Sequence, residues 1–322
     1  MTMEVYENRE QWLAARGIGA SAAPIILGLA PYGTWGSPFS LWAEMTGLAP
    51  RETDDAADKP WLEWGLRLEV PIAEAFSEKT LREVQLRPRH SLERHNDHPW
   101  LTASPDADQR LNVDEIEAYS DVGELPQLPL DRAIYQTPGL LQIKTASAFK
   151  ASEWKAGIPL YYQVQLQHEM YVSEKEWSTL CVLIDNSRFK VFPDVRRDDE
   201  FIKAMLPKLA HFQELIETQT EPPIDDSPAT SAALARMHWK DDGDTIVLPA
   251  ESAMWDASLV ETKELIKSLE AEKKRYENLM KAAIGNASYG LLPCGMRYSW
   301  KAFTKGEYVV PEHEEKPLRR VK

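Results

Sequence analysis

This sequence of 322 residues has only two cysteines, few glycines and no long hydrophobic run. The two cysteines lie far apart, which excludes a small scaffold held together by disulfides. Cys181 stands in the apolar run S-T-L-C-V-L-I and is expected to be a buried, reduced thiol. The 15 glycines form no repeat, and 43% of the residues are hydrophobic, so the chain is neither fibrous nor disordered and has enough apolar side chains for a buried core.

No apolar stretch reaches the ~18 residues needed to cross a membrane, and the N-terminus lacks the layout of a signal peptide. We therefore expect a cytoplasmic protein with no membrane association. Positive charge is also scarce, because 37 Lys and Arg face 51 Asp and Glu and the net charge is −14. This balance argues against a protein that coats nucleic acid over its whole surface, but it is compatible with a local basic groove.

The pattern along the chain predicts a large domain over residues 1–223 and a C-terminal extension over residues 224–322. In the large domain, helices are expected at 10–15, 22–27, 38–47, 61–80, 159–172 and 198–217. Ser21 is expected to cap the second of these helices, and Pro71 to kink or break the fourth. Strands are expected at 83–92, 140–145, 179–184 and 188–192, and the acidic insert at 111–138 is expected to be a loop.

The extension begins with a segment that resembles a linker, Asp225 to Ser231. A long amphipathic helix is expected next, because apolar side chains recur at alternating spacings of three and four: Leu259, Thr262, Ile266, Leu269, Tyr276 and Met280. Packing of this helix on its own core is favoured over an intermolecular coiled coil, and both alternatives are open. Short strands are expected at 289–292, 297–300 and 308–310.

Two segments point to chemistry: L-T-A-S-P-D-A-D at 101–108 and G-L-L-Q-I-K-T at 139–145. The first is a Pro-Asp turn and the second a short apolar strand, on which Gln142 and Lys144 share a face. Asp106, position 142 and Lys144 outline a PD-(D/E)xK nuclease core, in which carboxylates hold Mg²⁺ and the lysine orients the attacking water. The pattern has Asp or Glu where this sequence has Gln142.

Five motifs occur in a fixed order: G-I-G-A-S at 17–21, W-G-x-x-x-E at 64–69, S-P-D at 104–106, Q-I-K at 142–144 and Y-x-x-Q-L-Q-H at 162–168. Over residues 10–215 this order resembles the YqaJ-like viral recombinase and lambda-exonuclease family. The resemblance implies an α/β (α+β) fold, with a mixed central sheet flanked by helices and a helical C-terminal extension. It also implies a phage or prophage protein of the bacterial cytoplasm.

The implied activity is 5′-to-3′ exonuclease action on the ends of linear double-stranded DNA, in phage-type recombination by single-strand annealing. Two Mg²⁺ ions per active site, with Mn²⁺ as a substitute, a ring-like homo-oligomer and a single-strand annealing partner protein are expected as well. By the same resemblance, the metal ligands are Asp106, Gln142 and the backbone carbonyl of Ile143. The catalytic set is Glu69, Asp106, Gln142, Lys144 and Gln165.

The resemblance also places a group of residues on the DNA: Arg16, Ser21, Ser104 and Lys150, around a terminal 5′-phosphate, and Gln167. A helix N-terminus makes Ser21 suitable for binding an anion. The competing interpretation is that Arg16, Ser21, Ser104 and Lys150 are a helix cap, a turn serine and two surface cations. His168 is interpreted as a structural hydrogen-bonding residue.

Gln142 has three explanations, because an amide is a weaker Mg²⁺ ligand than a carboxylate. It is a deliberate inactivating change, or the mark of a divergent branch that recruits Asp108 or Glu69, or the result of lost catalysis with retained DNA binding. The otherwise intact set of motifs favours the first. The alternative function is accordingly that of a catalytically inactive DNA-end-binding or recombination scaffold.

Overall fold

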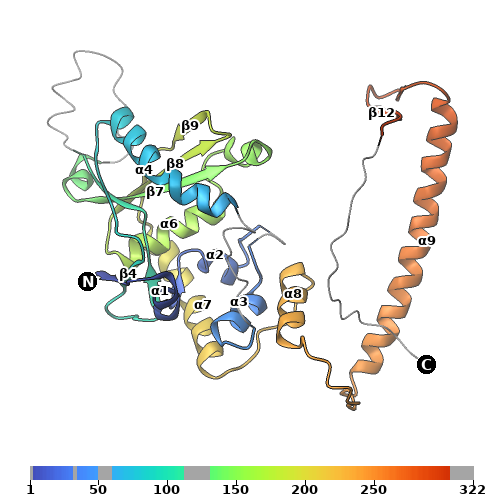
Figure 1. Ribbon diagram of the computed structural model, residues 1–322, viewed down its shortest axis with the longest axis horizontal. Coiled ribbons are helices and arrows are strands. Elements are labelled where there is room, and N and C mark those ends of the chain that lie inside the picture. The colour runs from blue at the N-terminus through green and yellow to red at the C-terminus, as the bar shows by residue number, and fades with distance from the viewer. Residues whose placement is uncertain (1–2, 32–34, 50–59, 112–130, 305–322) are drawn as a thin grey trace. The chain divides into compact units, whose positions relative to one another are not determined.

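A computed structural model, shown in Figure 1, describes residues 3–31, 35–49, 60–111 and 131–304. The chain divides into two compact units, unit 1 (Met1–Trp239) and unit 2 (Lys240–Lys322). Several sequence predictions lie mostly or wholly outside the described residues, namely the insert at 111–138 and the last strand at 308–310. Among the described residues, no helix has both the length and the apolar character that a membrane span requires.

Unit 1 is built on a mixed six-stranded sheet, which confirms the predicted fold class. The strand order is β10-β8-β7-β6-β3, and β9 also pairs with β8. The strands are β3 (Glu83–Leu86), β6 (Ala107–Arg110), β7 (Gly139–Ala146), β8 (Trp177–Ile184), β9 (Arg188–Val191) and β10 (Val195–Arg196). β7 runs parallel to β8 and antiparallel to β6, so the strand that carries Gln142 and Lys144 lies inside the sheet.

Two helices, α4 (Pro60–Thr80) and α6 (Leu160–Val172), cover opposite faces of β7 and β8. On one face Leu141 and Ile143 belong to the same apolar cluster as Phe76 of α4. On the other face Leu140 clusters with α6. Because side chains alternate along a strand, Gln142 and Lys144 share the α6 side with Leu140.

The other side of α6 faces a second layer. There a four-stranded sheet of order β1-β4-β5-β2 combines β1 (Met3–Val5), β2 (Ile18–Gly19), β4 (Ser91–Arg94) and β5 (Leu101–Ala103). Around it lie α1 (Arg9–Ala15), α2 (Ala23–Ile26), α3 (Pro38–Met45), α7 (Asp199–Glu217) and α8 (Pro228–Met237). The largest core cluster includes Val164 of α6 together with Ile18 and Leu101. Apolar contacts on both sides therefore bury α6 deeply.

Helix caps decide where several of these elements begin. Ser37 caps α3 in a reciprocal pair with Ser40, as the sequence predicts from Ser37-Pro38. The predicted cap by Ser21 is wrong, because α2 starts after Ala22 and no side chain caps it. Pro71 does not break α4, which continues through it. Pro71 is exposed, so the carbonyl that loses its helical hydrogen bond lies where water can satisfy it.

The predicted boundary at residue 223 lies too early in the chain. The segment interpreted as a linker contains the start of α8, which Ser227 caps by accepting a hydrogen bond from the N–H of Thr230. Ala233 is fully buried in the main core of unit 1, and Arg236 bonds Glu44 of α3. α8 packs on α3, so it belongs to unit 1, and the division falls between Trp239 and Lys240.

Unit 2 contains α9 (Ser252–Ile284) and a hairpin of β11 (Tyr289–Leu291) and β12 (Arg297–Ser299). Ile284, at the end of α9, lies close to Gly290 of β11. A Cβ added to Gly290 would lie 2.7 Å from the Cγ1 of Ile284. No residue of α9 is buried, so among the described residues of unit 2 its apolar side chains have no core to pack on. The intermolecular coiled coil stays a prediction.

Candidate active site

Asp106 lies in the turn between β5 and β6. Its side chain accepts a β7 backbone hydrogen bond beyond the end of the β6–β7 pairing. The ladder of β6 and β7 begins at the pair Ala107 and Leu141, so the N–H of Ile143 lies beyond its end. That N–H donates to Asp106 Oδ2 at 2.7 Å. Because the N–H and C=O of one strand residue point to the same side, the Ile143 carbonyl oxygen also faces Asp106. One backbone residue and one carboxylate are thus held together where the β6–β7 ladder ends.

Gln142 is buried beside Asp106 and has one unused oxygen. Its Nε2 donates to Asp106 Oδ2 at 2.5 Å. Its Oε1 is buried and has no hydrogen-bond partner in the described part of the chain. A buried amide oxygen without a partner is costly unless a donor or a cation occupies the position. The Gln142 amide is therefore oriented so that Oε1 is available to a hydrogen-bond donor or a cation.

Lys144 supplies the positive charge of the cluster. Its Nζ lies 5.3 Å from the centre of the Tyr162 ring on α6, a distance within the range of a cation–π contact. The same charge lowers the pKa of two acids from other elements, Glu69 and Asp106, against the larger effect of their burial. The ammonium of this half-buried lysine therefore has acidic neighbours.

Glu69 reaches the cluster from α4. It is half-buried, and its pKa is raised to about 7, mainly by desolvation and then by the nearby charge of Asp106. Arg89 and Lys144 oppose this shift but do not cancel it. The pKa of Asp106 is likewise raised, because burial outweighs the effects of Lys144, Ile143 and Gln142. The structure thus brings together Glu69, Asp106, Gln142 and Lys144 in one site.

A further acid, Glu169 on α6, was not identified from the sequence. It is 2% exposed, and Gln165 Nε2 donates to its Oε1 at 2.9 Å. Burial raises its pKa to about 7; Lys144 and the bond from Gln165 lower it, and Asp106 raises it. The sequence feature that could have identified Glu169 is a charged residue in a helix with apolar residues on every side. Such a helix has no solvent-exposed face for a carboxylate.

Beside this cluster lies a small cavity of about 110 Å³. Its lining includes three of the residues expected to bind a DNA end, Arg16, Ser21 and Ser104, as well as Gln165 and Glu169. Arg16 lies with its guanidinium carbon 4.5 Å from the centre of the Trp12 ring. A Cβ on Gly19 would meet Arg16 Nη2 at 2.7 Å, so glycine at this position leaves room for the guanidinium.

Other predicted residues are engaged elsewhere. Lys150 is exposed and pairs with Glu153 at 2.7 Å, and it does not line the cavity. Both ends of the Gln167 amide bond backbone groups, Arg196 O at 2.9 Å and Asp198 N at 2.8 Å, so this side chain ties α6 to the start of α7. Neither side chain is brought to the cluster.

Asp108 and His168 also have structural partners. Asp108 accepts two hydrogen bonds from Arg87, at 2.9 and 3.0 Å, so the structure does not support it as a substitute ligand. His168 Nε2 lies 3.1 Å from Thr102 O, and burial lowers the pKa of its ring to about 4. The sequence interpretation of His168 as a structural residue is confirmed.

The oxygens around Asp106 are suited to one hard cation. They are the Asp106 carboxylate, the unpartnered Oε1 of Gln142 and the carbonyl of Ile143. Two of the three are neutral, so they would hold Mg²⁺ less tightly than a set with a second carboxylate. Among the described residues, no three His, Cys, Asp or Glu side chains are grouped to hold a metal. The fit therefore depends on the amide and the carbonyl.

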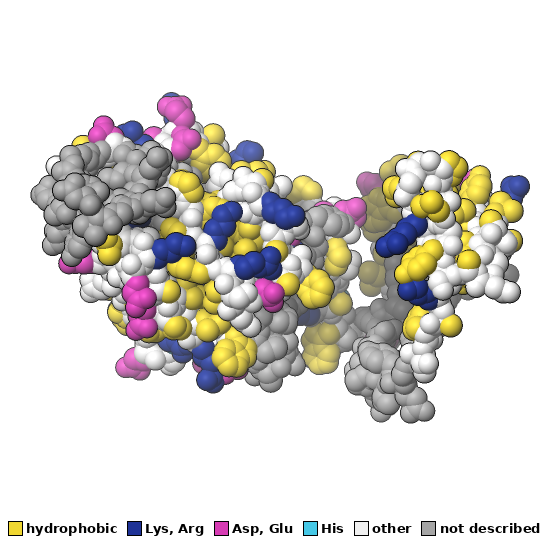
Figure 2. Space-filling view, turned by 90° about the horizontal axis from the view of Figure 1, so that it is seen from above, with side chains coloured by type: hydrophobic (Ala, Val, Ile, Leu, Met, Phe, Trp, Pro, Cys, Tyr) yellow, Lys and Arg dark blue, Asp and Glu magenta, His cyan; other side chains and the backbone are white. Residues whose placement is uncertain are grey.

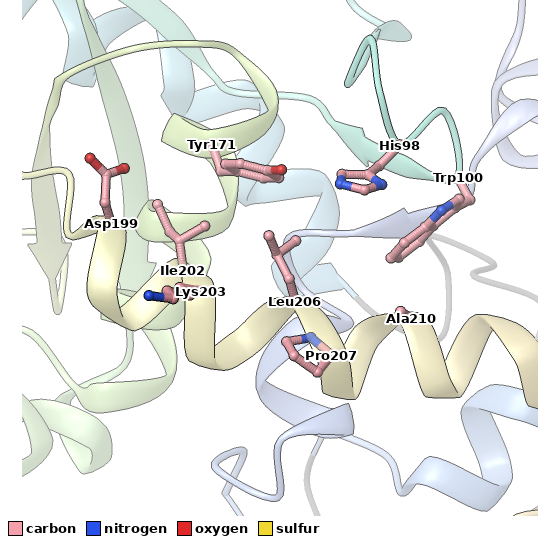
Figure 3. A pocket seen from close by; sticks show the side chains of 9 residues that line it. All are labelled: His98, Trp100, Tyr171, Asp199, Ile202, Lys203, Leu206, Pro207 and Ala210. Carbon is pink, nitrogen blue, oxygen red and sulfur yellow. The ribbon is translucent and has the colours of Figure 1, made fainter.

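Unit 1 has a larger hollow, of about 390 Å³, whose character is different (Figure 3). Figure 3 shows Tyr171, His98 and Trp100 along one side of it and Leu206, Pro207 and Ala210 of α7 along the other. Asp199 and Lys203 are its only charged lining residues, and its surface is mostly apolar. The described residues that line it include no group of acids comparable to the one around Asp106.

Residues 11–176 match the YqaJ-like viral recombinase domain, which is over half of the chain. The chain is 27% identical over 292 residues to the uncharacterized protein YqaJ of Bacillus subtilis (strain 168), an alignment that covers 88% of this chain and 81% of YqaJ. Among solved structures, an alkaline exonuclease from Laribacter hongkongensis shares 19% identity with a TM-score of 0.46, covering 66% of this chain and 94% of the exonuclease. A phage-related exonuclease from Haemophilus somnus 129PT shares 13% identity with a TM-score of 0.39, covering 66% and 98%.

Proposed function

This chain belongs to the YqaJ-like viral recombinase domain family, and on that premise we propose that it is a metal-dependent 5′-to-3′ exonuclease acting on the ends of linear double-stranded DNA. The observation that carries the proposal is the cluster of Glu69, Asp106, Gln142 and Lys144. These residues come from segments that are distant in the sequence. The stability of the fold gives no evident reason for a lysine to lie among these acids. A site that binds cations and phosphodiesters explains them together.

Each residue has a role in the proposal. Asp106, Gln142 Oε1 and the Ile143 carbonyl would hold Mg²⁺, with Mn²⁺ as a substitute, and Glu69 and Asp106 are the carboxylates available to a second ion. Bound Mg²⁺ would supply Lewis-acid stabilisation of the phosphate and a more acidic water. Lys144 attracts the scissile phosphate by its charge and orients the attacking water, and Gln165 contacts that phosphate through its amide.

The cavity that contains Arg16, Ser21 and Ser104 is proposed to receive the 5′ terminus. Gln165 and Glu169 line the same cavity, and the charges of Asp106 and Lys144 influence Glu169, so the end and the reacting phosphate would lie close together. Figure 2 shows a face of unit 1 with Lys and Arg side chains near its middle and Asp and Glu mostly toward its edges. Such a surface on an acidic chain suits local contact with DNA.

The proposal includes a role in phage-type recombination by single-strand annealing. It further includes a ring-like homo-oligomer and a single-strand annealing protein as partner, as the family resemblance implies. Residues 224–322 are proposed to contribute to stability, through α8 in unit 1, and to assembly or partner binding, because each candidate ligand named above lies before residue 170.

The test compares linear duplex with covalently closed circular duplex in Mg²⁺, with the linear DNA labelled at its 5′ or its 3′ ends. The expected result is early release of the 5′ label from linear DNA and no loss of circular DNA. Asp106→Asn is the matched control, and it should remove degradation without unfolding the protein. Equal digestion of circular DNA, or early release of the 3′ label, would refute the proposed activity.

One observation favours a second function, that of an inactive DNA-end-binding or recombination scaffold. Gln142 leaves Asp106 as the one carboxylate beside the Ile143 carbonyl in the described cluster, so metal binding is weakened. The same assay separates the two functions. A scaffold would bind linear ends in Mg²⁺ without degrading them, and Asp106→Asn would bind them equally well.

A further inference from the structure

The cavity beside the active site contains an acid that a pocket for an anion does not need. Glu169 lines it, is 2% exposed, and its Oε2 has no hydrogen-bond partner in the described part of the chain. Thr102 Oγ1, from the same lining, is also buried without a partner there. Buried polar atoms without partners indicate that the cavity takes a polar occupant.

The hydrogen-bonding groups of the cavity show what kind of occupant fits. Ser104 already donates its hydroxyl proton to Ser91 O at 2.6 Å, and its Oγ accepts from Trp12 Nε1 at 3.3 Å, so it has no proton left to donate to an occupant. Gln165 uses one of its N–H donors on Glu169. Glu169, when ionised, offers only acceptors. Beside the donors of Arg16, the lining thus contains a buried acceptor, the Glu169 carboxylate, which a phosphate cannot satisfy because it has no proton to donate.

We propose that Glu169 is a specificity-determining residue of this cavity: its carboxylate accepts a hydrogen bond from a 5′-hydroxyl end and disfavours a 5′-phosphate dianion. This inference rests on the proposed function, because it assigns the cavity to a DNA end. A 5′-hydroxyl satisfies both sides of the cavity, since its proton donates to Glu169 and its oxygen accepts from Arg16. A phosphate dianion pairs with Arg16 but brings two negative charges to a buried carboxylate, which is costly where the dielectric constant is low.

The consequence changes the expectation drawn from the motifs alone. Arg16, Ser21 and Ser104 by themselves predict a strong preference for 5′-phosphorylated ends. With Glu169 in the same cavity, the two kinds of end should bind with similar affinity. Burial raises the pKa of Glu169 to about 7, so the repulsion applies above this pH, where the carboxylate is ionised, and weakens below it. The affinities are therefore measured at about pH 8.

The experiment measures the affinity of the full chain for a short blunt duplex in chelator, so that no strand is cut. The duplex has either 5′-phosphate or 5′-hydroxyl ends, and an internal fluorophore reports binding. Wild-type protein should bind both within about threefold. Glu169→Gln keeps the shape and the oxygen that accepts from Gln165 but replaces the repelling charge with a donor, so it should favour the phosphorylated end by ~tenfold.

Two controls make the result specific. Glu78→Gln, on the exposed side of α4, makes the same change of charge away from the cavity and should leave the ratio of affinities unchanged. Arg16→Ala should lower the affinity for the phosphorylated end. If Arg16→Ala does so while Glu169→Gln leaves the ratio unchanged, the proposal for Glu169 is overturned although the end-binding cavity stands. If closed circular duplex binds as tightly as linear duplex, the proposed function fails, and this inference fails with it.

A second arm uses the wild-type protein alone and so does not depend on how Glu169→Gln folds. A 5′-sulfate ester has the shape of a phosphate but a single negative charge. The sulfate-ended duplex should bind more tightly than the phosphate-ended duplex. Tighter binding of the phosphate by ~tenfold would contradict the role of Glu169.

Discussion

Under the proposed function, residue 142 would decide how much catalysis the site supports. An amide at this position offers one neutral oxygen, whereas a carboxylate would add a negative charge beside Asp106. We predict that Gln142→Glu raises Mg²⁺-dependent degradation of linear duplex by roughly tenfold or more. The measurement is the initial rate of nucleotide release at saturating Mg²⁺.

Gln142→Leu is the matched control for this prediction, because it removes the oxygen without adding charge and should be slower than the parent. If Gln142→Glu degrades DNA no faster than the parent protein, position 142 does not bind metal. The structure also bears on the origin of Gln142. Asp108 is held by Arg87, so a branch that recruits another acid would use Glu69.

Glu169 makes stability depend on pH. Its pKa is about 7 in the folded protein and 4.5 in the unfolded chain, so the folded state holds its proton to higher pH. Its contribution to stability is fully present below pH 4.5 and is lost as the pH rises through about 7. We predict that Glu169→Gln stabilises the protein by roughly 1–3 kcal/mol at about pH 8 relative to its effect at about pH 5.

Urea denaturation at the two pH values measures this difference. Glu78→Gln serves as control, since an exposed carboxylate should give the same small change at both. An equal effect of Glu169→Gln at the two pH values would mean that the carboxyl is not protonated more readily in the folded state.

At the scale of elements, α8 determines where unit 1 ends. It buries Thr230 and Ala233 against unit 1, and Ser37 Oγ lies 2.7 Å from Thr230 Oγ1. We predict that a fragment ending at Trp239 is as stable as the full chain, whereas a fragment ending at Pro223 loses ~3 kcal/mol. Thermal unfolding of both fragments measures this. Equal melting temperatures would place the boundary at the earlier position.

The sequence predicted the longer elements and the local motifs well. α3, α7, β7 and β8 have clear periods or caps, and the S-P-D and Q-I-K motifs are short enough to recognise without the fold. β2 has two residues and β5 has three, too few to show a period. α8 was missed because its acidic, proline-containing start resembles a linker, although Ser227-Pro228 also forms a helix cap and first turn.

The parts of the site that the sequence did not predict depend on tertiary contacts. Glu169 is one helical turn after Gln165, but its role depends on a cavity shared with Arg16 and Ser104, which lie far away in the chain. Gln167 matched a motif equally well, yet its amide is used by two backbone groups that only the fold brings near. Motif spacing identifies the chemical type of a residue and leaves its partners undetermined.

For the whole molecule, a net charge of −14 limits how much of the surface meets DNA. A local basic face should neutralise only a few phosphates, so the logarithm of affinity should fall with the logarithm of salt concentration with a slope between about −2 and −5. Titrations of duplex at several salt concentrations measure the slope. A slope near −10, which corresponds to roughly ten neutralised phosphates, would contradict the picture of a small local contact.

The bond from the Ile143 N–H to Asp106 has a consequence for hydrogen exchange. This amide lies beyond the last rung of the β6–β7 ladder, so its protection depends on a side chain. Its exchange rate therefore reports the state of the Asp106 carboxylate at single-residue resolution. Asp106→Ala would expose the amide and speed its exchange, whereas Asp106→Asn retains an acceptor oxygen and should slow it again. A nuclear magnetic resonance signal from one backbone proton would then follow the active site without any DNA being cut.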